Sequence, residues 1–167
     1  IDRQMMAPSA LDPAEQQRLQ ALFAPFAAAV DDERPIRVLF RLAGEDIGAN
    51  ALALPGGTIV FTDQLVALAR NDDELLGVLA HEIGHVAHRH AMRRSIQASM
   101  MGVLAAIVVG DISAVSSAVT ALPLILTELG YSRAFEREAD AYAVDMMRRH
   151  GIDPRHLANI LQRLDPS

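Results

Sequence analysis

The sequence contains no cysteine and no tryptophan, and aromatic residues make up only 4% of its 167 residues. Without cysteine, any metal ion would have to be held by histidine, aspartate or glutamate side chains. Basic side chains are also outnumbered, with 15 Lys and Arg against 21 Asp and Glu. The resulting net charge of −6 argues against a general nucleic-acid binder. We therefore expect no nucleic-acid partner.

What the chain has instead is a hydrophobic composition of 51% in which alanine and leucine dominate. The length suits one domain, 1–167, that is large enough to bury a core. The first residue is Ile1 rather than methionine. We therefore expect a fragment from which targeting signals have been removed.

The order of local patterns predicts an α+β fold that is mostly helical, with a small antiparallel sheet. Helix starts are marked by Asp12 before Pro13, by Asn71 before three acidic residues, and by Ser132. Apolar, β-branched runs predict strands. The predicted helices are 12–30, 63–70, 72–94, 131–151 and 153–164, and the predicted strands are 35–43, 47–54 and 58–62.

The segment HEIGHVAHRH, residues 81–90, places four histidines and one glutamate in ten residues. On a helix, His81 and His85 lie one turn apart on the same side, so both imidazoles can reach one zinc ion. Glu82 would then lie beside the open coordination position, where a carboxylate can take a proton from a zinc-activated water. We expect His88 at the rim of this site and His90 in a structural position on the core side.

The same predicted helix has a narrow face of very small residues, Gly77, Ala80 and Gly84. Because these residues have almost no side chain, another backbone could pack closely against this face.

A catalytic zinc site usually has three protein ligands, and the third should come from the predicted helix 131–151. On its helical wheel, Glu136 and Asp140 lie four apart on neither the apolar strip nor the solvent face. We take Glu136 as the third ligand and Asp140 as a partner for the ring N–H of a ligand histidine. The alternative is a buried ion pair of these acids with Arg133 or Arg94. Glu138 is expected to be an ordinary surface charge.

HEIGH followed by SRAFEREAD resembles the HtpX and CAAX-prenyl-protease family of zinc metallopeptidases, family forty-eight of the gluzincin clan. NALALPGGTIVFT and GIDPRHLANILQRL are also similar to this family, so that the resemblance spans about residues 35–164. It implies a zincin-like catalytic domain with an active-site helix and one zinc per chain. The implied ligands are His81, His85 and Glu136. Glu82 is the implied general base, and Asp140 is implied to accept the ring N–H of a ligand histidine.

The resemblance also implies that an edge strand lines the substrate cleft, where a peptide would add as a further strand. The implied substrate-binding residues are Asn50, Ala51, Leu52, Ala53 and Leu54. The family usually carries a His-Pro motif and an arginine beyond the last helix, and we expect those to lie outside this chain. Tyr131 and His156 are candidate substitutes for them.

Residues 95–129 form an apolar stretch with one central charge, Asp111. The two halves are each shorter than the roughly 20 residues that span a bilayer as a helix. Two alternatives stay open: buried or lid helices over the cleft, or a hairpin inserted in the membrane interface.

The sequence therefore favours a zinc endopeptidase acting on peptides or unfolded proteins at a bacterial membrane or in the periplasm, in envelope protein quality control. A second hypothesis is a peptide-binding or chaperone-like module with a structural zinc. A third is an autoinhibited site in which a histidine such as His88 caps the zinc.

Overall fold

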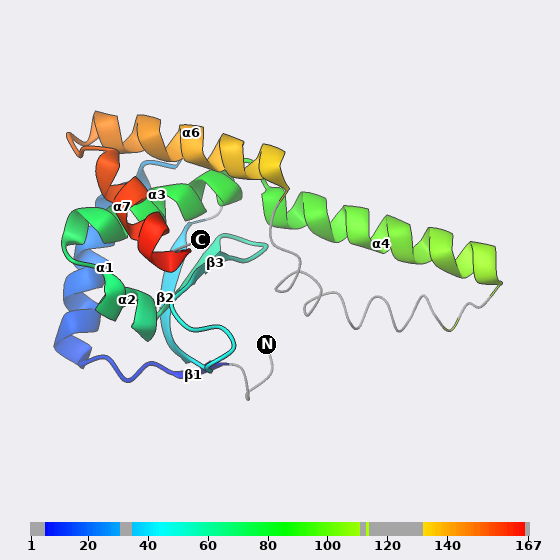
Figure 1. The fold of residues 1–167 in the computed structure, drawn as a ribbon, viewed down its shortest axis with the longest axis horizontal. Coiled ribbons are helices and arrows are strands. Elements are labelled where there is room, and N and C mark those ends of the chain that lie inside the picture. The colour runs from blue at the N-terminus through cyan, green and yellow to red at the C-terminus, as the bar shows by residue number, and fades with distance from the viewer. Residues whose placement is uncertain (1–5, 31–34, 111–112, 114–131, 166–167) are drawn as a thin grey trace.

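The computed structural model describes residues 6–30, 35–110, 113 and 132–165 (Figure 1). It confirms the α+β, mostly helical fold. In chain order the elements are β1 (Met6–Pro8), α1 (Pro13–Ala28), β2 (Arg37–Ala43), β3 (Ala51–Ala53), β4 (Thr58–Thr62), α2 (Asp63–Leu68), α3 (Asp72–Ala87), α4 (His90–Val109), α6 (Arg133–Arg149) and α7 (Arg155–Leu164).

The predicted helix starts are confirmed by their capping bonds. The side chain of Asp12 accepts from the N–H of Ala14, that of Asn71 from Glu74, and that of Ser132 from Phe135. Each bond satisfies one N–H that the first turn of a helix leaves without a partner.

The sheet has the strand order β1-β2-β4-β3 and is mixed, so the prediction of an antiparallel sheet is wrong for its centre. β2 pairs with β4 in parallel, while the two outer pairs are antiparallel. β3 and β4 form a hairpin around Gly56 and Gly57, and the hairpin joins β2 through its second strand. β4 is almost wholly buried, and a strand covered on both faces belongs inside a sheet. β3 is therefore left at the edge.

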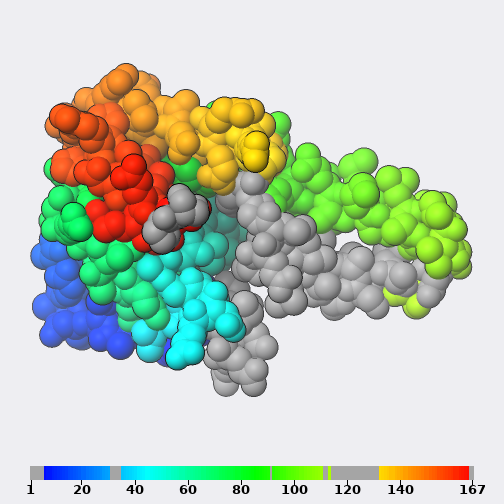
Figure 2. Space-filling view, viewed as in Figure 1, coloured from blue at the N-terminus to red at the C-terminus, as the bar shows by residue number. Residues whose placement is uncertain are grey.

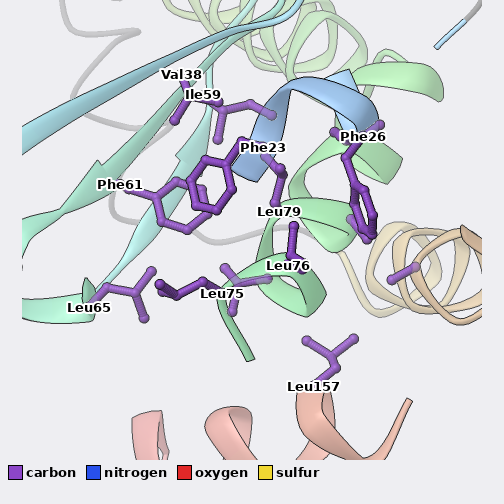
Figure 3. Close-up of a cluster of buried hydrophobic side chains, with 14 of the residues drawn as sticks. Phe23, Phe26, Val38, Ile59, Phe61, Leu65, Leu75, Leu76, Leu79 and Leu157 are labelled. Atoms are coloured by element: carbon purple, nitrogen blue, oxygen red, sulfur yellow. The ribbon is translucent and has the colours of Figure 1, made fainter. Parts of the chain in front are cut away.

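The core lies between the sheet and helices α1, α3 and α7 (Figure 3). The rings of Phe23 and Phe61 lie 5.2 Å apart and join α1 to β4. Helix α3 is buried at every position from Glu74 to His85, because other elements surround it. In Figure 1, α6 lies along it. The central helix thus carries the HEIGH segment through the middle of the molecule.

The predicted helix 72–94 is wrong at its C-terminal end, because the helix breaks after Ala87. Arg89 adopts a left-handed conformation with φ of 54°, and α4 begins at His90. No glycine or proline marks this position, so nothing in the local pattern indicates it.

Helix α4 stands out from the body of the molecule (Figures 1 and 2). It covers the first half of the predicted apolar stretch 95–129, and most of that half is exposed, although Ala106 is buried. Its exposed apolar side chains are Met92, Ile96, Met100, Met101, Val103, Leu104, Ile107, Val108 and Val109. By length and composition alone, Met92–Val109 could cross a membrane, which is weak evidence. The second half of the stretch, apart from Ser113, lies outside the described residues.

A buried ion pair joins the start of α3 to the last helix. Glu74 is 2% exposed, accepts from the N–H of Arg70 at 2.8 Å, and pairs with the guanidinium of Arg163. Burial by itself raises the pKa of Glu74, but these two partners together lower it. The carboxylate therefore stabilises the fold above the ordinary pKa of the group, and this stabilisation is lost as the pH falls through the lowered value.

Arg163→Met is expected to lower the free energy of unfolding by about 3 kcal/mol at pH 7, because it leaves a buried carboxylate without its cation. Urea titration measures the loss. The deficit should shrink as the pH is lowered, since a protonated Glu74 needs no cation. The double variant Glu74→Leu/Arg163→Met is the control and should recover most of the stability. A double variant as unstable as Arg163→Met would contradict this account.

Candidate active site

Helix α3 presents three polar side chains inside the protein, two at adjacent positions and the third one turn further along. His81, Glu82 and His85 are 8%, 7% and 2% exposed. A buried polar group is costly unless it is hydrogen-bonded, paired or bound to a metal. Their burial therefore requires partners, and most of these come from α6.

The two helices approach closely because Gly84 has no side chain. A Cβ at this position would lie 2.9 Å from the Cα of Ala139 and 3.0 Å from its carbonyl oxygen. This confirms the predicted close backbone packing on the small-residue face. The contact sets Ala139 directly against α3, with Glu136 and Asp140 on either side of it in the sequence.

One nitrogen or oxygen atom from each of His81, His85 and Glu136 lies within 4.8 Å of the other two, and these three could hold a metal ion. The Nε2 atoms of the two histidines are 3.1 Å apart. Nε2 of His81 lies 3.3 Å from Oε2 of Glu136, and Nε2 of His85 lies 3.6 Å from Oε1 of the same carboxylate. Four tetrahedral ligands at zinc–ligand distances of about 2.0–2.1 Å stand about 3.3 Å from one another. The three donors therefore fit zinc in type and in spacing.

Glu82 lies beside this group, and its carboxylate accepts from the backbone N–H of Ala53. Its Oε2 is buried and has no hydrogen-bond partner among the residues that the structure describes. Burial, helped by the charge of Glu136, raises the pKa of Glu82 to about 7, against the lowering by His81 and the Ala53 N–H. A carboxyl group with such a pKa can both take and return a proton near neutral pH.

Asp140 lies where the sequence predicts it, with Oδ1 at 3.0 Å from Nδ1 of His81. Burial alone would lower the pKa of His81, but hydrogen bonds to Asp140 and Glu136 and the charge of Glu82 raise it to about 10.

The two acids of α6 are less enclosed than the helical wheel suggested, since the side chains of Glu136 and Asp140 are 41% and 53% exposed. No described element covers that side of α6 closely enough to bury them.

The surroundings of His85 were missed by the sequence analysis. Its Nδ1 lies 2.8 Å from Nδ1 of His90, whose Nε2 lies 2.8 Å from Oε2 of Glu138. The expectation that Glu138 is an ordinary surface charge is therefore wrong. Burial first, then the positive charge of His81, lowers the pKa of His85 to about 3, so that its ring is neutral.

No sequence signal indicates this contact, because it depends on the break between helices α3 and α4 at Arg89. His88, expected at the rim, is exposed at the end of α3 and stacks on His90. Its Nδ1 lies 3.7 Å from Glu138. His88 thus belongs to the surroundings of His90.

Strand β3 contains Ala51, Leu52 and Ala53, with Asn50 and Leu54 at its two ends. Leu54 donates to Thr58, and Thr62 donates to Asn50. Since paired positions alternate along an antiparallel strand, the backbone groups of Ala51 and Ala53 face the outer edge of the sheet. The Ala53 N–H that reaches Glu82 lies on this edge.

The two candidate substitutes for the missing family residues are not brought to this site. His156 is on α7 and lies 3.6 Å from Asp73, at the other end of α3 from His85. Tyr131 lies outside the described residues.

Comparison with known proteins gives one family match. The model described as "Peptidase family M48" matches residues 13–165. The chain is 30% identical to the beta-barrel assembly-enhancing protease of Yersinia pestis, over 97% of this chain and 35% of that protein. It is 33% identical to the metalloprotease LoiP of Escherichia coli (strain K12), over 69% of this chain and 47% of that protein. It is 27% identical to the mitochondrial metalloendopeptidase OMA1 of Arabidopsis thaliana, over 69% of this chain and 23% of that protein.

The chain thus spans about a third of the length of the beta-barrel assembly-enhancing proteases that it matches. The matched region includes both helices of the candidate site, α3 and α6.

Proposed function

The chain belongs to peptidase family M48, and on that premise we propose that it is the catalytic domain of a zinc-dependent endopeptidase. In this proposal His81, His85 and Glu136 hold one zinc ion, Glu82 is the general base, and Asp140 orients His81. The observation that carries the proposal is the convergence of three zinc-type donors beside a buried carboxylate oxygen that no described residue satisfies.

The chemistry that zinc supplies when bound is that of a Lewis acid, which polarises a carbonyl and lowers the pKa of water from about 16 towards about 7. The chain supplies the proton transfers. Oε2 of Glu82 accepts the proton of the attacking water, and a raised pKa lets the same carboxyl pass it to the leaving amine. The Ala53 N–H holds the other part of the carboxylate in place.

The hydrogen bond from His81 to Asp140 fixes the ring of that histidine. With Nδ1–H donated to the Asp140 carboxylate, the lone pair of Nε2 faces the donor cluster. His81 would hold the metal through Nε2 only in its neutral form, so binding requires it to lose the proton that its raised pKa favours.

A peptide substrate would add to the outer edge of β3. Main-chain hydrogen bonds of this kind give affinity with little dependence on side chains, which suits unfolded proteins. The residues proposed to form this edge are Asn50, Ala51, Leu52, Ala53 and Leu54. The contact between Ala53 and Glu82 would align the bound strand with the general base.

We propose that the enzyme acts in quality control of membrane or envelope proteins, at a bacterial membrane or in the periplasm. Support comes from the relatives whose name concerns β-barrel assembly and from the exposed apolar surface of α4. In this proposal the apolar stretch 95–129 is either a hairpin at the membrane interface or a lid.

The competing function is a peptide-binding module in which zinc is only structural. Such a module does not need a carboxylate beside the metal, and the buried Glu82 therefore favours the enzyme. An enzyme keeps an open coordination position, whereas a structural site is closed by a fourth protein ligand.

Metal removal tests the proposal directly. The chain as purified is expected to contain about one zinc per molecule, measured by elemental analysis, because His81, His85 and Glu136 together would hold one ion. Dialysis against a chelator should abolish cleavage of an unfolded protein, and one equivalent of zinc should restore it. Zinc-independent cleavage would sink the proposal, whereas zinc-dependent peptide binding without cleavage would establish the binding module.

A further inference from the structure

The rings of His85 and His90 face each other through the same ring atom, Nδ1. Their Nδ1 atoms are 2.8 Å apart, so one of them must donate a proton and the other must accept it. Two N–H groups pointing at one another at this distance would repel, and two lone pairs would form no bond. The direction of this hydrogen bond therefore fixes the tautomer of both rings.

The partner of His90 on its other side decides the direction. Nε2 of His90 lies 2.8 Å from the Glu138 carboxylate, which only accepts when ionised. Nε2 therefore carries the hydrogen of a neutral His90, and its Nδ1 is left as the acceptor. Nδ1–H of His85 then donates to His90, and the lone pair of His85 is on Nε2, facing His81 and Glu136.

The contact between His85 and His90 depends on the left-handed conformation of Arg89, which ends α3 before α4 begins. On a continuous helix, residues five apart point about 140° away from each other, at about 100° per residue. The turn at Arg89 brings the ring of His90 back onto His85. A left-handed conformation costs a residue with a side chain roughly 1–2 kcal/mol.

His90 is itself held rigidly. It is 0% exposed, and its ring stacks on Phe135 of α6 with centroids 4.2 Å apart and planes inclined by 4°. Glu138, which receives its N–H, is on the same helix as Phe135, one turn further along. The ring is thus fixed by packing on its face and by hydrogen bonds at both nitrogens.

We propose that His90 and Glu138 are positioning residues that hold His85 in the tautomer able to bind the metal. The inference rests on the proposed metal site and extends it. Asp140 and Glu138, both on α6, would then orient the two histidines separately, Asp140 directly and Glu138 through His90.

The same hydrogen bonds oppose simultaneous metal binding at His88, His90 and Glu138, whose side chains also bring donor atoms together. A metal on Nε2 of His90 would move the ring hydrogen to Nδ1. His90 would then donate to His85, and the hydrogen of a neutral His85 would move to Nε2, where it blocks the first site. With neutral rings, the two sites are mutually exclusive.

Four variants of the 167-residue chain test the proposal: His90→Phe, His90→Asn, Glu138→Gln, and Asp145→Asn as a matched control on the exposed face of α6. Phenylalanine keeps the stacking on Phe135 but accepts no hydrogen bond. Asparagine places an amide oxygen near the position of Nδ1, so it can still accept from His85. The zinc dissociation constant is measured by chelator competition, the tautomer of His85 by ¹⁵N shifts of the metal-free protein, and folding by the Tm without metal.

His90→Phe is expected to weaken zinc binding about 10- to 100-fold and to move the His85 hydrogen towards Nε2. His90→Asn should recover most of the lost affinity, and Glu138→Gln should fall between them. Asp145→Asn should bind as the wild type does. A purely structural role would lower the Tm of both His90 variants without a difference in tautomer between them.

Unchanged zinc affinity in His90→Phe would overturn the inference, as would equal losses in His90→Phe and His90→Asn with the same His85 tautomer. Two zinc ions per wild-type chain, the second lost in Glu138→Gln, would overturn it as well. Failure of the wild type to bind zinc at all would instead refute the proposed metal site, so the two failures are distinguishable.

Discussion

Glu82→Gln is expected to lower kcat/KM for peptide hydrolysis by about 10²- to 10⁴-fold, the usual contribution of a positioned general base. Glutamine has nearly the same shape and can still accept from the Ala53 N–H, but it cannot take a proton from water. His81, His85 and Glu136 are unchanged in this variant. Zinc content should therefore stay at about one per chain while activity is lost.

The stability of the same variant provides the control. Because burial raises the pKa of Glu82 above its ordinary value, ionising it works against folding, and this cost grows as the pH rises from the ordinary value to about 7. Without metal, Glu82→Gln should therefore unfold at a Tm at least as high as that of the wild type at pH 8. A variant that loses activity and Tm together would indicate a folding defect instead, and one that keeps full activity would remove Glu82 from the mechanism.

Gly84→Leu is expected to weaken zinc binding by about 10²-fold or more, the loss that a displacement of about 1 Å can cause at a positioned site. A Cβ at Gly84 would meet the backbone of Ala139 at 2.9 Å, and backbone atoms cannot rotate out of the way. Helix α6 must therefore move away from α3 and carry Glu136 with it. Overpacking of this kind costs about 3 kcal/mol of folding free energy, and the helix propensity gained by replacing glycine offsets under about 1 kcal/mol.

Gly77→Ala is the matched control on the same helix. A Cβ there would meet the flexible end of Met147 at 3.2 Å and Leu157 of α7 at 3.1 Å. This substitution is expected to shift Leu157 and Met147 by a few tenths of an ångström and to leave the contact between Gly84 and Ala139 intact. It should change the Tm without a selective loss of zinc affinity. If Gly84→Leu folds and binds zinc as tightly as Gly77→Ala does, the close helix packing does not position Glu136.

Several features of this protein could be predicted from short-range patterns alone. Asp12, Asn71 and Ser132 each begin a helix because their side chains satisfy N–H groups a few residues away. The spacing of His81 and His85 puts both on one side of a helix, and the small residue at position 84 leaves room for another backbone. The wheel of the second helix also separates Glu136 and Asp140 from its apolar strip. All of these depend on geometry within a few turns of one helix.

The tertiary structure decided the remaining features, because they depend on which surfaces meet. The apolar, β-branched run 58–62 marks β4 as a strand but does not say that it pairs in parallel with β2. The turn at Arg89 adopts a left-handed conformation although the residue is not a glycine, so local preference does not predict it. His90 and Glu138 are 48 residues apart, and the sequence predicts a structural histidine and a surface acid rather than a bonded pair. The sequence by itself determined which side chains share a helix face, and only the packing of α3, α4 and α6 determined which of them touch His85.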